Sequence, residues 1–192
     1  MLSPVVQGAL NEQITTELFS SYNYLAMSAF CERQNFRGCA QWLRVQSQEE
    51  YAHAMKLYDF LLARNGKVEL KAIQAPRTDY DSIPQVFAET LKQEEEVSRR
   101  IDQLYELAFK EKAFAALVQL QWFITQSRSR LAGCFSVYQQ GKLLPSVLGE
   151  EAVGSPPGVL DQFLGNEIGI HFILTGIGKP PHPGKEVGHS EG

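Results

Sequence analysis

Glu50 and His53 form a pair whose residue types and spacing could bind a metal. On a helix, residues three apart lie on one face, so the two side chains point the same way. The rest of that face follows the spacing of a packed, mostly apolar seam: Leu43, Gln46, Leu57 and Phe60. A carboxylate and an imidazole in such a seam need a partner, because burying an unpaired charge is costly, and a transition-metal cation is the simplest joint partner. The pair alone is common by chance, so the prediction depends on ligands from other helices.

Two further glutamates lie on seams of other predicted helices. Glu17 occupies the seven-residue series of Leu10, Tyr24 and Cys31, and Glu94 lies mid-way along an apolar stripe of the third helix. Each glutamate taken alone would be read as a surface residue. Three carboxylates at one level of a bundle core would repel one another unless a cation separated them. An oxygen-rich site with one imidazole suits iron or manganese, with zinc able to compete.

Tyr24 lies two helical turns after Glu17 on the same seam. Its hydroxyl could hydrogen-bond a ligand or take part in electron transfer. A tyrosine simply packed in the core is the alternative, and the sequence does not choose between them.

Four long helical stretches must position these residues. Apolar periodicity and capping residues predict helices from Ser3-Pro4 to about 34, then over about 37–64, 82–110 and 112–140. Gly66 is predicted at the left-handed position that ends the second helix. The connection over about 65–81 is too long for a hairpin, so we expect it to cross the length of an all-α four-helix bundle. A short fifth helix is predicted over 156–168. Residues 1–170 form one domain in this prediction, and 171–192 a disordered tail.

Composition limits the classes of function. The chain has 192 residues, a net charge of −4 and a pI of about 5.6, so bulk electrostatics does not favour nucleic-acid binding. No apolar run approaches the ~20 residues that a membrane-spanning helix needs, and the N-terminus has no signal-peptide pattern. Cys31, Cys39 and Cys134 are widely spaced and odd in number, which favours reduced thiols in a cytoplasmic protein.

Several motifs together resemble the bacterial non-haem ferritins over residues 1–170. The motifs are ALNEQITTEL at 9–18, SSY at 20–22, YLAM at 24–27, EEYAHAMK at 49–56, AIQAP at 72–76 and LQWF at 120–123. The resemblance implies a ferritin-like bundle and a hollow shell of two dozen subunits that stores a ferric mineral. It also implies a di-iron ferroxidase centre, at which Fe(II) is oxidised by O2 or H2O2.

The resemblance also implies roles for individual residues. Glu17, Glu50 and His53 would bind the first iron, and Glu50, as a bridge, and Glu94 the second. Tyr24 and Glu50 are the candidate catalytic residues, and the short C-terminal helix would line a symmetry-axis channel. Haem is not expected, because Tyr51 stands where haem-binding relatives carry methionine.

The predicted fourth helix departs from the family pattern. Relatives carry glutamate and glutamine ligands there, whereas this chain has Ser127 and Arg130, and only Glu49 remains of the third iron site. The Arg130 guanidinium could turn inward, pair with Glu94 or Glu50 and weaken the second iron site. Alternatively it leans out of the bundle and leaves a working two-iron site.

The favoured function is therefore an iron-storage ferritin with ferroxidase activity. The first alternative is a storage or nucleation subunit in which Arg130 reduces or abolishes that activity. A di-iron oxygenase or peroxidase is the second, although the fourth helix lacks the second ExxH that such enzymes usually carry.

Overall fold

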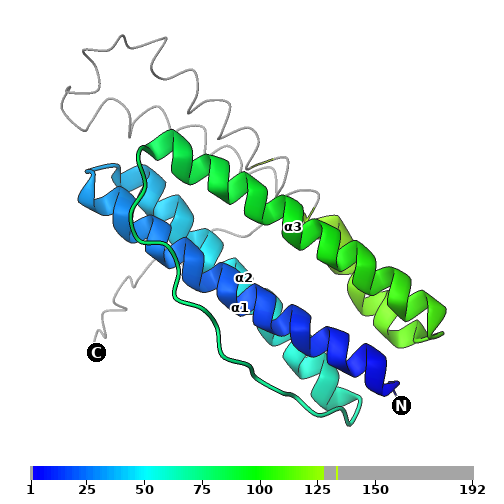
Figure 1. Cartoon of the computed structure of the whole chain (residues 1–192). Coiled ribbons are helices and arrows are strands. Elements are labelled where there is room, and N and C mark those ends of the chain that lie inside the picture. Colours follow the sequence, from blue (N-terminus) through cyan, green and yellow to red (C-terminus); the bar gives the residue numbers. More distant parts are fainter. Residues whose placement is uncertain (1, 128–132, 134–192) are drawn as a thin grey trace, which may run out of the picture.

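The computed structural model describes residues 2–127 and 133, and every regular element in them is helical. Helix α1 spans Pro4–Arg33, α2 spans Arg37–Ala63 and α3 spans Ile83–Lys110. A fourth helical segment covers 114–127. The helices lie side by side as a bundle (Figure 1), and no strand occurs among the described residues. The predicted all-α four-helix bundle is thus confirmed.

The helix starts follow from local capping. Ser3 precedes α1 and its hydroxyl accepts the Val6 amide at 3.4 Å, while Ser82 precedes α3 and accepts the Gln85 amide at 3.3 Å. Both helices have proline in the first turn, where its missing amide hydrogen costs nothing. These caps agree with the predicted starts.

The end of α2 differs in detail from the prediction. Asn65, not Gly66, adopts the left-handed conformation, with φ of 53°. An asparagine tolerates this region because its short polar side chain can bond locally. Gly66 is favoured for a different reason: a Cβ there would lie 3.0 Å from the Leu61 carbonyl oxygen, closer than most Cβ contacts.

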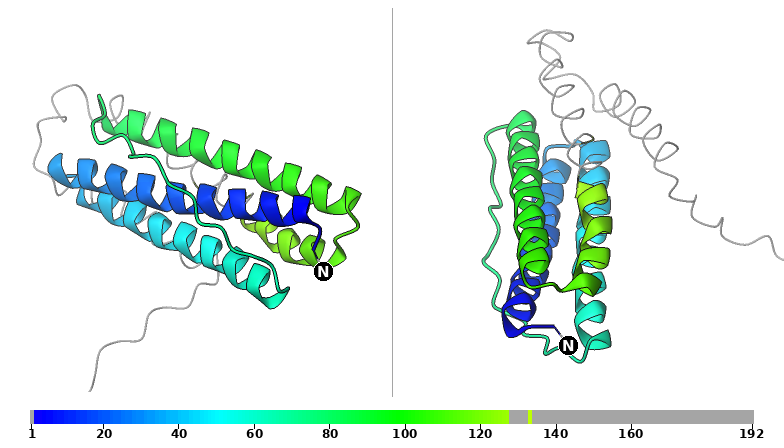
Figure 2. Two further views of the ribbon diagram at one scale, coloured as in Figure 1. Left: turned by 60° about the horizontal axis from the view of Figure 1, so that its bottom comes forward. Right: turned by 90° about the vertical axis from the view of Figure 1, so that its right-hand side faces the viewer.

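The connection between α2 and α3 runs along the whole bundle beside α1 (Figures 1 and 2). Near one end Asn11 holds it, donating to the Lys67 carbonyl at 2.9 Å and accepting the Glu69 amide at 2.8 Å. Near the other end Arg33 donates to the Thr78 carbonyl at 2.8 Å. The predicted long crossover is confirmed, and it makes α2 and α3 parallel.

The core consists of two apolar clusters with a polar level between them. On α1 one cluster ends at Ile14 and the other begins at Tyr24; on α2 they are separated between Leu43 and Ala54. The buried glutamates of α1 and α2 fall in these gaps. Burying ionisable groups at one level of an otherwise apolar core marks that level as a place where a function overrides stability.

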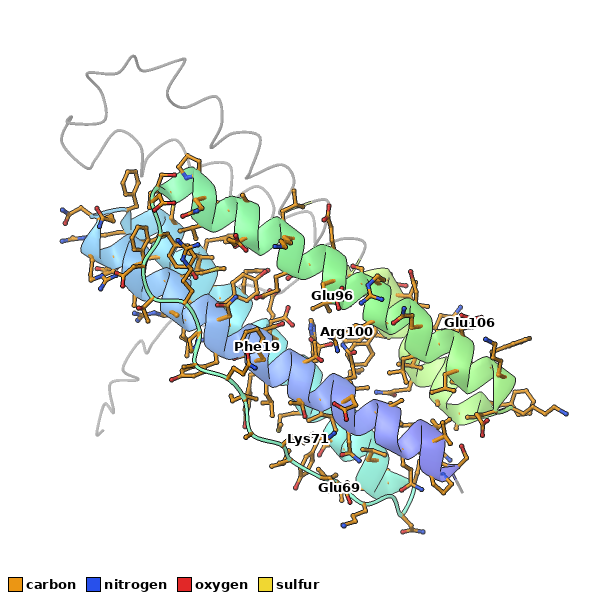
Figure 3. The ribbon with its side chains drawn as sticks, in the orientation of Figure 1. Phe19, Glu69, Lys71, Glu96, Arg100 and Glu106 are labelled. Carbon is orange, nitrogen blue, oxygen red and sulfur yellow. The ribbon has the colours of Figure 1, made fainter. Side chains whose placement is uncertain are left out.

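The three consecutive glutamates of α3, Glu94, Glu95 and Glu96, differ in their burial. Glu96 accepts hydrogen bonds from Arg99 and Arg100 at 2.7–2.8 Å, on the side of α3 from which the Arg100 guanidinium also reaches a threonine of α1 (Figure 3). Glu95 is exposed, whereas Glu94 is fully buried. The helical period therefore turns only one of the three consecutive glutamates inward.

Other predictions fall outside the described residues. These are the fourth helix beyond 127, the helix over 156–168, the domain boundary at 170, the tail over 171–192, and the positions of Arg130 and Cys134. Among the described residues, no helix is long and apolar enough to cross a membrane.

Candidate metal centre

The packing of α1 against α2 brings Glu17, Glu50 and His53 together. One potential ligand atom from each lies within 4.8 Å of the others. His53 Nδ1 is 3.8 Å from Glu50 Oε2 and 4.0 Å from Glu17 Oε2. Two ligand atoms on one transition-metal ion, each at about 2.1 Å, lie at most about 4.2 Å apart, and both separations are below that limit.

The burial of this group leaves polar atoms that need a partner. Glu17 and Glu50 are fully buried, and His53 is 6% exposed. Glu17 Oε2 and His53 Nδ1 have no hydrogen-bond partner within the described part of the chain. Buried polar atoms are nearly always paired in native proteins. A cation between these two atoms would satisfy both.

His53 has the protonation state that a metal ligand requires. Burial lowers the pKa of His53 below its usual value of 6.5, against the opposing effect of the Glu17 carboxylate, and the Lys56 charge lowers it further. The imidazole is therefore neutral at physiological pH, and the neutral ring is the form that binds metals.

Aromatic side chains of the fourth helical segment hold the His53 ring. Trp122 and Phe123 contact it edge-on, with ring centroids 5.3 and 5.8 Å away. Lys56, one turn along α2, places its ammonium group 4.4 Å above the Trp122 ring. These contacts limit rotation of the imidazole, so His53 Nδ1 stays directed at the two carboxylates.

Glu94 approaches the same level from α3, bound to Tyr24. The Tyr24 hydroxyl donates to Glu94 Oε1 at 2.6 Å, and both side chains are fully buried. Burial raises the pKa of Glu94 to about 7; the Tyr24 hydrogen bond opposes this, and the charges of Glu17 and Glu49 add to it. Tyr24 is thus both a packed core residue and a hydrogen-bond donor to a candidate ligand. Glu94 lies outside the group of three whose ligand atoms approach within 4.8 Å.

The chain matches the ferritin-like domain family over residues 7–142, more than half of its length. The chain belongs to the ferritin family. It is 36% identical over 126 residues to the bacterial non-haem ferritin of Staphylococcus aureus (strain USA300), covering 66% of this chain and 76% of that protein. The Staphylococcus haemolyticus (strain JCSC1435) protein of the same name is 38% identical over 126 residues, with the same coverage. The predicted resemblance is confirmed.

Solved structures agree with this assignment. The open-pore ferritin of the archaeon Archaeoglobus fulgidus superposes with a TM-score of 0.76 at 34% sequence identity, covering 84% of this chain and 95% of that one. A closed form of the same ferritin, engineered by mutagenesis, gives a TM-score of 0.77 at 34% identity, with 85% and 96% covered.

The fourth wall of the candidate site contributes no carboxylate within 114–127. Ser127, one of the two atypical residues, is buried, and its hydroxyl donates to the Ile124 carbonyl of its own helix at 3.1 Å. A serine bonded in this way is satisfied locally and does not need a metal.

One hydrogen-bond donor at the site was not predicted from the sequence. The side-chain amide of Gln13 donates to Glu17 Oε1 at 2.8 Å, and Gln13 is only 3% exposed. The available signal was the four-residue spacing, which places the two side chains on one helix face. Glutamine at that spacing is too common to be selected without the fold.

Proposed function

We propose that this ferritin stores iron and oxidises it at a centre inside the bundle. The observation that carries the proposal is the buried group of Glu17, Glu50 and His53, in which Glu17 Oε2 and His53 Nδ1 lack hydrogen-bond partners in the described residues. A protein of this family with such a group has the ligands for a ferrous ion in a place shielded from water.

In this proposal the four buried ligands hold two ferrous ions. Glu17, Glu50 and His53 bind the first, and Glu50 with Glu94 binds the second, so that the Glu50 carboxylate bridges them. Each ferrous ion gives up one electron. The two electrons, with two protons, reduce O2 to H2O2 or H2O2 to two water molecules, and hydrolysis of the ferric products by water supplies those protons and releases more. The protein contributes the ligands, their spacing and the aromatic wall around His53.

Tyr24 has a defined part in the proposal. Its hydroxyl fixes Glu94 Oε1 and opposes the rise in the pKa of that carboxyl. A Glu94 side chain that is more readily ionised binds a cation more readily, because the metal need not displace a proton. Electron transfer, one of the alternatives that the sequence left open for Tyr24, is tested separately through the pH dependence of Tyr24→Phe.

The competing proposal is a storage subunit with weak ferroxidase activity. It is supported by Ser127, whose hydroxyl donates to its own helix. The fourth helix therefore provides no ligand for the second iron at this position. The competing proposal also requires the Arg130 guanidinium to turn inward. We favour the oxidising site, because the candidate ligands on α1, α2 and α3 are all buried.

Assembly into a shell of two dozen subunits is part of the same proposal. Large apolar side chains are exposed on α1, α2 and the crossover, where neighbouring subunits could cover them: Tyr22, Leu25, Tyr51, Leu70 and Ile73.

The proposed location is the reducing cytoplasm, which is favoured by the Fe(II) substrate and by the buried thiols of Cys31 and Cys39.

Rapid mixing of the iron-free protein with Fe(II) in air tests the proposal. We expect Fe(III) absorbance to appear within seconds, and to appear no faster than in buffer alone when Glu50→Ala or His53→Ala is used. Glu106→Ala is the matched control, because Glu106 is an exposed glutamate of α3 paired with Lys110 and lies away from the site. Wild-type protein that oxidises iron no faster than buffer would favour the storage-only subunit.

A further inference from the structure

The carboxylate of Glu17 has two oxygens in different environments. Oε1 accepts a hydrogen bond from Gln13 Nε2 at 2.8 Å. Oε2 is buried, has no hydrogen-bond partner among the described residues, and lies 4.0 Å from His53 Nδ1. The Gln13 amide nitrogen can only donate, so the lone pair of Oε1 that faces it is occupied.

The position of Gln13 makes this hydrogen bond persistent. It lies one helical turn before Glu17 on α1, and both side chains are buried. Water therefore does not compete for the amide, and the shared helix fixes the distance between the two backbones. The bond holds the plane of the carboxylate and leaves Oε2 directed at His53.

We propose that Gln13 is a positioning residue that makes Glu17 a one-oxygen ligand, binding a divalent cation through Oε2 alone. This inference rests on the proposed metal site. Hydrogen-bonding partners of this kind orient metal ligands. A Glu17 that binds through one oxygen leaves a further coordination position on the ion, and such a position is what a metal needs in order to meet an oxidant or water.

Glu94 has a comparable partner. Its Oε1 accepts from Tyr24 at 2.6 Å, so each outer carboxylate of the site is held through one oxygen by a neutral donor. The donors differ in origin. Tyr24 reaches Glu94 from another helix, whereas Gln13 and Glu17 belong to the same helix. The Gln13 contact therefore does not depend on the packing of α1 against α3.

Substitution Gln13→Met tests the proposal, because methionine keeps the length of the side chain and removes the donor. Cobalt(II) is the probe, since its visible d–d absorption reports both occupancy and coordination. We expect Gln13→Met to weaken binding of the first Co(II) by about 10–100-fold and to change the shape of the d–d spectrum. Gln7→Met is the matched control on the same helix; Gln7 bonds to the Leu2 carbonyl and the Lys67 amide, away from the site.

The outcomes separate this proposal from the proposed function. Wild-type affinity and an unchanged spectrum in Gln13→Met would overturn it, even if iron oxidation is rapid. If wild-type protein binds Co(II) but does not oxidise Fe(II), the ferroxidase proposal fails. The role of Gln13 is then still decided by the Co(II) affinity and spectrum of Gln13→Met. Absence of Co(II) binding to the wild type would overturn the Gln13 proposal, whereas the ferroxidase proposal would still be decided by the Fe(II) assay.

A crystal structure of the wild-type protein with Co(II) gives an answer that does not depend on how well a variant folds. We expect Glu17 to bind the ion through Oε2, with Gln13 Nε2 still within hydrogen-bond distance of Oε1. Binding of the ion by both oxygens of Glu17, or a Gln13 side chain turned away, would contradict the proposal.

Discussion

The walls of the buried site differ sharply between the first three helices and the fourth helical segment. Helices α1, α2 and α3 bring three carboxylates, an imidazole, and the donors Gln13 and Tyr24. The fourth segment, over 114–127, brings the aromatic rings of Trp122 and Phe123 and a serine bonded to its own backbone. One side of the site is built to hold charge, and the other to hold an imidazole ring in place and exclude water.

This difference indicates which residues the activity should depend on. Charged groups buried at one level destabilise the protein unless a ligand compensates them, so their presence on three helices marks a function. Aromatic packing stabilises the fold in any case. We therefore expect substitutions on the first three helices to change iron chemistry strongly, and polar substitutions on the fourth wall to change it little.

The largest effect is expected from Glu94→Gln. The amide keeps the shape of the side chain but removes the negative charge that would hold the second iron. The initial rate of Fe(II) oxidation should therefore fall by about 100-fold or more. This loss exceeds the range for residues that only orient a ligand. Stopped-flow absorbance measures the rate. Tight binding of the first metal ion should persist, and its loss would show that Glu94 belongs to both sites.

Tyr24→Phe should have a smaller effect. Removing the hydroxyl deprives Glu94 Oε1 of its donor, which raises the pKa of Glu94 further and weakens the second site at neutral pH. We expect the rate to fall by about 10–100-fold. The rate should recover partly as the pH is raised, because Glu94 then ionises without help. A deficit that stays the same at every pH would instead indicate electron transfer from the tyrosine.

The pH dependence of stability tests the electrostatics of the metal-free protein. The pKa of Glu94 is raised to about 7, so its contribution to stability is fully present below its ordinary pKa near 4.5 and is lost as the pH rises through 7. The pKa of His53 is lowered, so its contribution is present above 6.5 and is lost as the pH falls. Between pH 6.5 and 8 the melting temperature of the wild type should fall more than that of Glu94→Gln. Parallel curves would show that Glu94 does not carry this pH dependence.

The smallest effects are expected from the fourth wall. Ser127→Ala removes a hydroxyl that bonds only to its own helix, and an Arg130 that leans outward plays no part in the chemistry. Both Ser127→Ala and Arg130→Gln should keep the oxidation rate within about twofold of the wild type, the scale of a few tenths of a kcal/mol. A marked gain in rate for Arg130→Gln would show that the arginine weakens binding of the second iron. It would also contradict the expectation that the fourth wall affects the oxidation rate little.

Much of the fold could be predicted from the sequence. The serine cap followed by proline located the start of α1, Ser82 marked the start of α3, and the length of the segment after α2 predicted the crossover. The seven-residue spacing placed Glu17 on a seam, and the structure buries it. These features are local or periodic, so a single sequence carries them.

Contacts between helices could not be predicted in the same way. Whether Tyr24 reaches Glu94 depends on the register of α1 against α3, and the contact of Trp122 with His53 depends on the packing of the fourth segment against α2. The sequence left the role of Tyr24 open for that reason. The residue that ends α2 was also misplaced, because asparagine and glycine both tolerate positive φ and the close approach of Leu61 was not visible.

The most direct test of the central claim is to locate iron in the protein. Crystals loaded with Fe(II) without oxygen, measured by anomalous scattering at the iron absorption edge, show each bound ion. We predict one peak among Glu17, Glu50 and His53 and a second between Glu50 and Glu94, with none coordinated by Ser127. Iron absent from these positions, or held by residues of the fourth helix, would contradict the account.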